Sequence, residues 1–181
     1  NDELKNTNEQ LKKLKNLLQK TNRELKKQAT TDDLTGLYNQ RHMYEKLNYE
    51  IEKSIVSRTS FCLIMIDLDG FKVINDSFGH IAGDEYLKTI SSIIKKNLRN
   101  KDRAFRYGGD EFLIVLPKTC LKVAIKISEK IKIKIEDSNL KITLSCGIKQ
   151  WSGENLKEIL KSVDTLLYKA KKSGKNCICC E

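Results

Sequence analysis

Proline and long hydrophobic runs are nearly absent from this chain of 181 residues. The single proline, Pro117, follows an apolar run, and no low-complexity linker or internal repeat divides the chain. The longest apolar run, Phe61 to Ile66, is far shorter than the ~20 residues that a membrane-spanning helix needs, and no signal peptide is visible. We therefore expect a cytoplasmic chain that makes no membrane contact itself, with one globular domain and an appendage.

Cysteines are present, but they lack the spacing of a disulfide framework. The six lie in apolar segments or crowd near the C-terminus, at positions 62, 120, 146, 177, 179 and 180. Reduced thiols are the expected state. A zinc site in the tail Cys177-Ile178-Cys179-Cys180 would need a histidine or a second cysteine pair nearby, which the sequence does not supply. A short final strand is the favoured interpretation of the tail.

Aromatic residues are few, at 7%, and they are not spaced along a charged groove as in nucleic-acid-binding proteins. The formal net charge of +10 would suit an anionic partner such as a nucleotide phosphate, although lysines on solvated helix faces explain most of it. We expect no nucleic-acid partner. Because the chain begins at Asn1 rather than methionine, we also expect an upstream sensory domain in a longer protein. A membrane-anchored sensor protein, of which this chain is the cytosolic part, is compatible with that expectation.

Residues 1–30 carry a heptad pattern that predicts a coiled coil. Leucines recur every seven residues, with one more leucine between them, and the remaining seam positions are polar. The leucines are Leu4, Leu11, Leu14, Leu18 and Leu25, and the polar seam residues are Thr7, Thr21 and Gln28. A weak, parallel, two-stranded coil that joins two copies of the chain is the preferred interpretation. The alternative is a single amphipathic helix that packs on its own domain.

Residues 31–181 alternate between helical and strand patterns. After a turn at 31–39, helices are predicted near 40–56, 71–77, 81–98, 119–135 and 154–172, and strands near 60–67, 102–107, 111–117, 140–149 and 175–180. This order predicts an α/β sandwich (α+β) of ferredoxin-like type, with a mostly antiparallel central sheet flanked by helices.

The segment Arg106-Tyr107-Gly108-Gly109-Asp110-Glu111-Phe112 predicts a hairpin whose turn carries two acids. Glycines at 108 and 109 would permit positive φ angles and the close approach of a bulky ligand to the main chain. A carboxylate pair at an exposed tip can bind a metal ion. An ordinary solvated turn, in which glycine and aspartate are common, is the alternative.

Asp67 and Asp69 lie at the end of the buried strand 60–67. If this strand pairs beside the hairpin, Asp67 and Asp110 meet at one edge of the sheet, where two carboxylates suit Mg²⁺ together with phosphate oxygens. Alternatively, these acids cap the next helix, and Asp69 is the better placed of the two for that role.

The runs "DLDGFKVINDSFGHIAGDEYL" and "RYGGDEFLIVLP" resemble the GGDEF family of diguanylate cyclases, and the resemblance extends from about Asp33 to Asn176. It implies condensation of two GTP molecules into cyclic di-GMP and two pyrophosphates, on a fold related to nucleotide cyclases and polymerase palms. It also implies a domain division at residues 1–30 and 31–181.

By this resemblance, Asp67, Asp110 and the backbone carbonyl of Leu68 bind Mg²⁺, with Mn²⁺ as the alternative ion. Glu111 would be a further ligand or would activate the attacking hydroxyl, and Gly108 and Gly109 would leave room for guanosine. The general base stays open between Asp110, Glu111 and a hydroxide held by the metal.

The resemblance also assigns the substrate contacts. Asn75 and Asp84 would read guanine, since an amide and a carboxylate match its acceptors and donors. His80 would contact the nucleotide or pack in the core. Phosphate contacts are implied for Gly70, Phe71, Lys72, Lys171 and Lys175. Family members often have arginine where Lys175 stands. The bidentate contact of an arginine with phosphate would here be replaced by the single charge of a lysine ammonium.

Regulation is the last implication. One site holds one GTP, so a homodimer is required, and the coil would raise the local concentration of the two domains. Arg99 and Asp102 match an inhibitory site for the product, with Lys130 in support, and a surface ion pair is the alternative. A non-catalytic nucleotide-binding or product-sensing module is the second candidate function.

Overall fold

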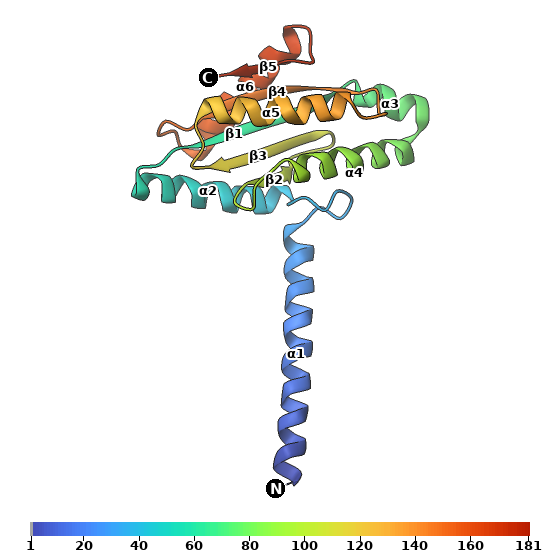
Figure 1. The fold of residues 1–181 in the computed structure, drawn as a ribbon, viewed down its shortest axis with the longest axis vertical. Coiled ribbons are helices and arrows are strands. Elements are labelled where there is room, and N and C mark those ends of the chain that lie inside the picture. Colours follow the sequence, from blue (N-terminus) through green and yellow to red (C-terminus); the bar gives the residue numbers. More distant parts are fainter. Residues whose placement is uncertain (1) are drawn as a thin grey trace.

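The computed structural model describes the backbone of residues 2–181 and the side chains from residue 6 onward. The first helix, α1 (Asp2–Thr30), projects from the domain as an isolated stalk (Figure 1). Leu11, Leu14, Leu18 and Leu25 are each more than half exposed, so the alternative of a helix packed on its own domain is wrong. The side chain of Leu4, the first heptad leucine, lies outside the described residues.

The domain contains a five-stranded sheet in the order β2-β3-β1-β4-β5. All neighbouring strands are antiparallel except β4 and β5, which confirms the predicted fold class. The strands are β1 (Phe61–Asp69), β2 (Arg103–Arg106), β3 (Glu111–Pro117), β4 (Thr143–Gln150) and β5 (Ile178–Cys180). The helices are α2 (Gln40–Ser57), α3 (Phe71–Phe78), α4 (His80–Lys96), α5 (Leu121–Glu136) and α6 (Leu156–Lys172).

The central strand β1 is buried on both faces, which explains its continuous apolar sequence. Its even-numbered side chains, such as Ile64, pack with α4 and α5, whereas its odd-numbered side chains, such as Leu63, pack with α2 and α6. Since successive strand residues alternate between faces, the parity of a residue number tells on which side of the sheet its side chain lies.

Gly147 in β4 brings α6 close to the sheet. A Cβ atom there would lie 2.4 Å from the carbonyl oxygen of Val163 and 2.5 Å from the amide nitrogen of Leu167, so only glycine fits this contact. The close packing fixes the C-terminal end of α6, which carries Lys171, beside the end of β1. No helix among the described residues is long and apolar enough to cross a membrane.

Candidate active site

Asp67 and Glu111 are direct partners in the antiparallel pairing of β1 and β3. Their odd numbers match those of Leu63 and Leu113, which pack with α2 and α6, so both carboxylates lie on the α6 side of the sheet. Asp110 precedes Glu111 at the tip of the hairpin, and its carbonyl oxygen accepts a hydrogen bond from the amide of Leu68 at 3.4 Å. The hairpin and the end of β1 therefore bring three acidic residues to one edge, as the sequence predicted.

Lys171, on α6, forms an ion pair with Asp67. Its Nζ donates to Oδ2 of Asp67 at 2.5 Å, across 104 positions of sequence. Burial raises the pKa of the Asp67 carboxyl, the Lys171 ammonium opposes that shift, and the charges of Asp110 and Asp69 add to it, so that the net pKa lies above its ordinary value. The ionised carboxylate is thus short of positive charge even with Lys171 present.

The Glu111 carboxylate also has too little positive charge around it. Burial raises the pKa of its carboxyl, and the charge of Asp67 raises it further. Carboxylates that repel one another at an edge with one lysine fit a divalent cation, which would neutralise them. No cluster of three or more Asp, Glu, His or Cys side chains is arranged as a metal-binding group within the described chain, so phosphate oxygens of a ligand would have to complete the coordination.

Asp69 does not cap α3, and that part of the sequence prediction is wrong. Its carboxylate accepts hydrogen bonds from the hydroxyls of Thr143 and Ser145 on β4 and from the amide of Asn176, at 2.8, 2.7 and 3.0 Å. Gly70 occupies the N-cap position of α3 with a φ of 77° and provides no side chain. Asp69 therefore ties β1 to β4 and to the segment after α6.

The two hairpin glycines do not use the freedom to adopt positive φ angles that the sequence offers them. Neither Gly108 nor Gly109 is among the glycines with positive φ. A Cβ at Gly109 would meet no atom within 4 Å, and one at Gly108 would come within 3.1 Å of Oε2 of Glu111. Positive φ therefore does not explain the glycines: Gly109 borders open space, whereas a side chain at Gly108 would press on the Glu111 carboxylate.

A cavity of about 320 Å³ lies between the hairpin tip and the α3–α4 pair. It combines predicted guanine contacts with residues of the hairpin. Its lining residues are Phe71, Lys72, Asn75, His80, Asp84, Leu87, Arg106, Gly109 and Asp110. Asp110 is the acid shared by the cavity and the carboxylate cluster, because its charge also acts on Asp67 and Glu111.

Gly83 determines where Asn75 lies. A Cβ at Gly83 would fall 2.0 Å from Oδ1 of Asn75 and 3.2 Å from Cζ of Phe71. Because of this, α4 approaches α3 closely and the Asn75 amide rests against the α4 backbone. Gly83 was not predicted as a site residue, although a glycine inside a helical pattern is a recognised signal of close packing.

The expected phosphate contacts are not all gathered at one place. Lys72 lines the cavity, whereas Lys171 is paired with Asp67. Lys175 is exposed in the turn after α6, where Lys175 and Asn176 have φ angles of 63° and 50°. Within the described part of the chain, the Lys175 side chain forms no ion pair and no hydrogen bond. Gly70 and Phe71 form the start of α3, next to the cavity.

Arg106 is a second residue that the sequence analysis missed. Its Nη2 and Nε donate to the carbonyl oxygen of Gly109 at 2.9 and 3.2 Å, and its Nη1 lies 3.2 Å from Oδ2 of Asp32. One guanidinium therefore joins the turn of the hairpin to the segment that follows α1. The two partners are far apart in sequence, so no local pattern indicated the contact.

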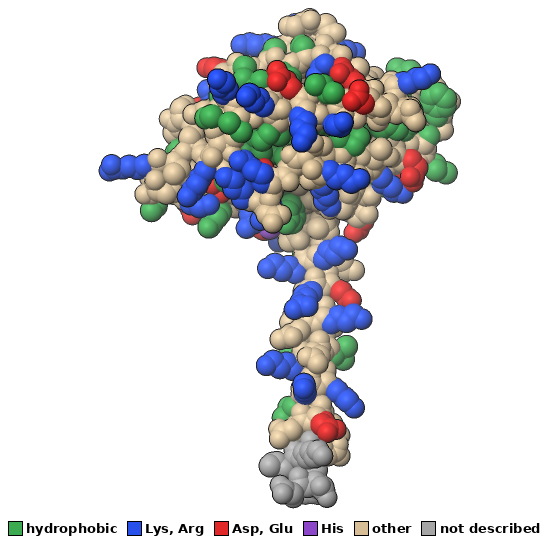
Figure 2. Space-filling view, viewed as in Figure 1, with side chains coloured by type: hydrophobic (Ala, Val, Ile, Leu, Met, Phe, Trp, Pro, Cys, Tyr) green, Lys and Arg blue, Asp and Glu red, His purple; other side chains and the backbone are tan. Residues whose placement is uncertain are grey.

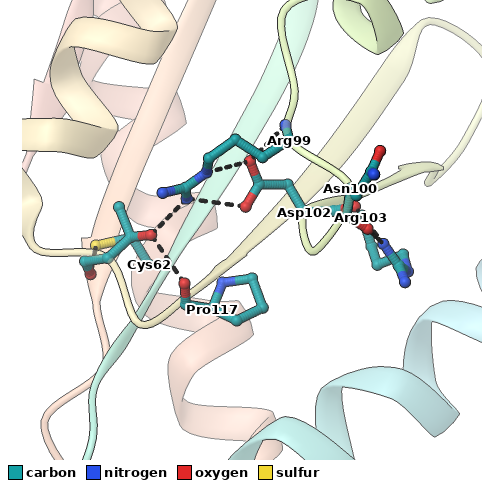
Figure 3. A network of polar contacts seen from close by, with 7 residues as sticks. Cys62, Arg99, Asn100, Asp102, Arg103 and Pro117 are labelled. Carbon is teal, nitrogen blue, oxygen red and sulfur yellow. Dashed lines mark hydrogen bonds and ion pairs between the residues drawn. The ribbon is translucent and has the colours of Figure 1, made fainter.

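Arg99 and Asp102 form a closed ion pair (Figure 3). Nε and Nη2 of Arg99 donate to the two carboxylate oxygens of Asp102, each at 2.9 Å, and the amide of Arg99 donates as well. The Asp102 side chain is fully buried, and Arg99 also donates to Oγ1 of Thr119. The ion-pair alternative is thus present in this structure, and a ligand would reach Asp102 only after Arg99 moved.

A separate cavity of about 320 Å³ lies beside this pair. Arg99, Asp102, Lys95 and Arg103 are among its lining residues. Lys130 does not line it and is exposed on α5. Two of the three residues predicted for an inhibitory site thus line one cavity, and the third is not among its lining residues.

Comparison with known proteins gives one consistent result. The family model "Diguanylate cyclase, GGDEF domain" matches residues 29–177. The response regulator PleD of Caulobacter vibrioides is 36% identical over 161 residues, which are 83% of this chain and 36% of that protein. The uncharacterized protein YtrP of Bacillus subtilis is 39% identical over 150 residues, 81% of this chain and 25% of that protein. The chain thus spans about a third or less of the length of these relatives.

Solved structures agree with the sequence comparison. The coiled coil and GGDEF domain of DgcB from Caulobacter crescentus, in complex with c-di-GMP, superposes with a TM-score of 0.88 at 26% identity and covers 98% of this chain and 97% of that one. Diguanylate cyclase SiaD from Pseudomonas aeruginosa, in complex with its activator SiaC, gives 0.84 at 31% identity, over 98% of this chain and 72% of that one. The chain belongs to the diguanylate cyclase GGDEF-domain family.

Proposed function

We propose that this chain condenses two GTP molecules into cyclic di-GMP and two pyrophosphates, and that each subunit of a homodimer holds one GTP. Membership of the GGDEF family supports this activity, as do the relatives that are named diguanylate cyclases, such as DgcP of Pseudomonas aeruginosa. The observation that carries the proposal is the position of Asp110, which lines the cavity of Asn75 and Asp84 while its charge acts on Asp67.

Guanine would occupy the cavity between the hairpin and the α3–α4 pair. The Asp84 carboxylate can accept from N1–H and the exocyclic amine of guanine, and the Asn75 amide can pair with a ring acceptor. Adenine lacks the donor pair, so it would leave the Asp84 carboxylate without these two hydrogen bonds. His80 and Leu87 line the same cavity and would contact the purine.

The triphosphate would then run over Gly108 and Gly109 toward the carboxylate cluster. In each of two steps, the 3′-hydroxyl oxygen of one GTP forms a bond to the α-phosphorus of the other, the bond from that phosphorus to the pyrophosphate oxygen breaks, and the hydroxyl proton is lost. Lys171 and Lys72 supply positive charge for the phosphates. Asp110, Glu111 and a hydroxide held by the metal are the candidates to accept the proton.

The proposed cofactor is Mg²⁺, with Mn²⁺ as the alternative. Asp67, Asp110, Glu111 and the carbonyl of Leu68 would contribute ligands, phosphate oxygens of the nucleotide would complete the coordination, and the ion would neutralise the charge that develops on the phosphates. The raised pKa values of Asp67 and Glu111 support this assignment, because both carboxylates lack sufficient counter-charge from the protein.

The homodimer would form through α1. Four of its exposed leucines, Leu11, Leu14, Leu18 and Leu25, lie at heptad seam positions, so a second α1 would bury them. Coil formation keeps two domains at a high effective concentration, and a change in the coil would convey a signal from an upstream sensory domain to the two half-sites. Removal of residues 1–28 should therefore lower the rate at concentrations where the shortened chain is monomeric.

Product inhibition at Arg99 and Asp102 is a second proposed function. The adjoining cavity supports it, since Lys95, Arg99 and Arg103 provide cations for a bound phosphate. The complex of DgcB with c-di-GMP is a property of that relative and is consistent with such a site. Inhibition that persists unchanged in Arg99→Ala would contradict the assignment.

Incubation of the purified protein with GTP and Mg²⁺ tests the main proposal. Pyrophosphate release and the mass of the product are followed, and Asp110→Ala serves as the control. We expect cyclic di-GMP from the intact chain and at least a hundredfold lower rate from the variant. Nucleotide binding by a dimeric wild-type protein that forms no product would favour a non-catalytic binding module instead.

A further inference from the structure

The turn between α3 and α4 exposes large apolar side chains next to the guanine cavity. Phe78 is 70% exposed at the end of α3, and Ile81 is 84% exposed in the first turn of α4. Val73, also on α3, is 64% exposed. Figure 2 shows hydrophobic side chains gathered at the end of the molecule where α3 and α4 lie. Apolar groups gathered on a surface commonly mark a site of contact with another molecule.

These side chains do not belong to the cavity itself. Asn75 and His80 flank Phe78 in the chain and line the cavity, whereas Phe78, Ile81 and Val73 are not among the lining residues. Nor does the domain core use them, since Phe71 and Ile74 are the α3 side chains that pack against buried residues. The apolar surface of the α3–α4 turn therefore surrounds the site without forming part of it.

We propose that Phe78 and Ile81 form the contact surface for the second copy of the chain when the two half-sites meet. This inference rests on the proposed function, because a bond between two nucleotides requires the cavity of one subunit to face that of the other. A surface at the rim of the cavity must then come close to the partner. The two-fold symmetry of a homodimer would place the same residues on both sides of the contact.

The small size of the surface agrees with this role. Two or three side chains bury much less than the ~1,200 Å² that a stable interface needs, so the contact does not hold two free domains together. With α1 dimerised, the contact becomes intramolecular and can form and open during each reaction cycle. A weak contact also suits an enzyme whose product is made between the subunits and must leave.

The test compares two double variants that remove similar apolar area. Phe78→Ser with Ile81→Ser changes the proposed contact, and Ile55→Ser with Val56→Ser changes α2 residues that are 61% and 85% exposed. We expect the first pair to lower the rate of cyclic di-GMP formation at least tenfold. Affinity for a non-hydrolysable GTP analogue should change less than twofold, and the dimer formed by α1 should persist in light scattering. The second pair should retain the wild-type rate.

An unchanged rate in the first pair would overturn the proposal, and so would a parallel loss of nucleotide affinity, which would place the residues in the substrate site. A second measurement does not depend on turnover. Photoreactive benzoylphenylalanine in place of Phe78 should cross-link to a second copy of the chain when the GTP analogue and Mg²⁺ are present. Absence of that cross-link contradicts the contact, whereas a wild-type protein without any turnover contradicts the proposed function instead.

Discussion

Arg106 and Asp32 form an ion pair across 74 positions of sequence, with 3.2 Å between Nη1 and Oδ2. Asp32 lies in the turn that follows α1, and the same guanidinium holds the carbonyl of Gly109 in the hairpin. The backbone supports this link, since the amide of Arg106 donates to the carbonyl of Tyr38 at 2.8 Å. One side chain thus connects the segment that follows α1 to the hairpin tip.

Arg106→Ala should reduce the rate of product formation more than tenfold while the protein stays folded. Loss of the hydrogen bonds to Asp32 and Gly109 should cost about 1–3 kcal/mol in the free energy of unfolding. Steady-state rates and urea denaturation measure the two effects. Arg41→Ala is the control, because Arg41 is 83% exposed and its pair with Glu45 is at the 4.0 Å limit. Equal rates in the two variants would show that Arg106 does not position the hairpin.

Asp32 should make a contribution to the free energy of unfolding that depends on pH. Burial raises the pKa of its carboxyl, but hydrogen bonds from Thr35 and the charge of Arg106 outweigh burial, so the net pKa lies below its ordinary value of 3.8. A lowered pKa stabilises the folded protein at pH values above the pKa of the carboxyl in the unfolded chain. This stabilisation is lost as the pH falls through the pKa of the carboxyl in the folded protein. The stability difference between wild type and Asp32→Asn should therefore hold above about pH 5 and shrink below about pH 4. Denaturation midpoints of the two proteins, measured across this pH range, check the expectation, and a stability difference that does not change with pH would contradict it.

Gly83 and Asn75 should behave as a coupled pair. Gly83→Ala places a Cβ in contact with the Asn75 amide, so we expect weaker binding of a GTP analogue and a loss of about 1–3 kcal/mol in unfolding free energy. In an Asn75→Ala background the main clash is gone, and the higher helix propensity of alanine should make the second substitution nearly neutral or stabilising by up to about 1 kcal/mol. A double-mutant cycle measures this coupling, and strictly additive effects would contradict it.

Asp67→Asn should abolish activity without loss of stability. Because burial raises the pKa of Asp67 in the folded protein, its ionised form costs stability at neutral pH in the absence of a bound cation. The variant should melt at the wild-type temperature or above it. Lys171→Met should instead melt a few degrees lower, on the order of 1 kcal/mol, because it leaves the carboxylate without its cation. A lower melting temperature for Asp67→Asn would show that the ion pair outweighs the cost of burial.

Periodic patterns predicted most of the fold. The alternation of helices and strands placed each element of the domain within a few residues, and the apolar run before Asp67 correctly indicated a central buried strand. The convergence of Asp67 with Asp110 followed from pairing of that strand with the hairpin. Helices and strands are local features, and the meeting of Asp67 with Asp110 depends on the pairing of only two strands. Sequence periodicity can therefore predict them.

The roles of Asp69 and Arg106 were not predicted for one physical reason, which is contact between distant segments. Capping of α3 was the alternative role considered for Asp69, yet it accepts hydrogen bonds from Thr143 and Ser145 of β4, whose register the sequence does not reveal. Arg106 appeared only as a residue before the glycines, because its partner Asp32 precedes α2. Long-range polar pairs of this kind have no periodic signature.

Mixing wild-type chains with Asp110→Ala chains tests most directly the claim that one subunit supplies half of an active site. Cyclic di-GMP needs both bonds, so a mixed dimer should stop at the linear dinucleotide. At equal amounts of the two chains and constant total protein, with free exchange of subunits, cyclic di-GMP formation should fall to about a quarter of the wild-type rate, the fraction of dimers with two intact subunits. A fall to about half, in proportion to wild-type chains, would show that each subunit works alone and would contradict the account.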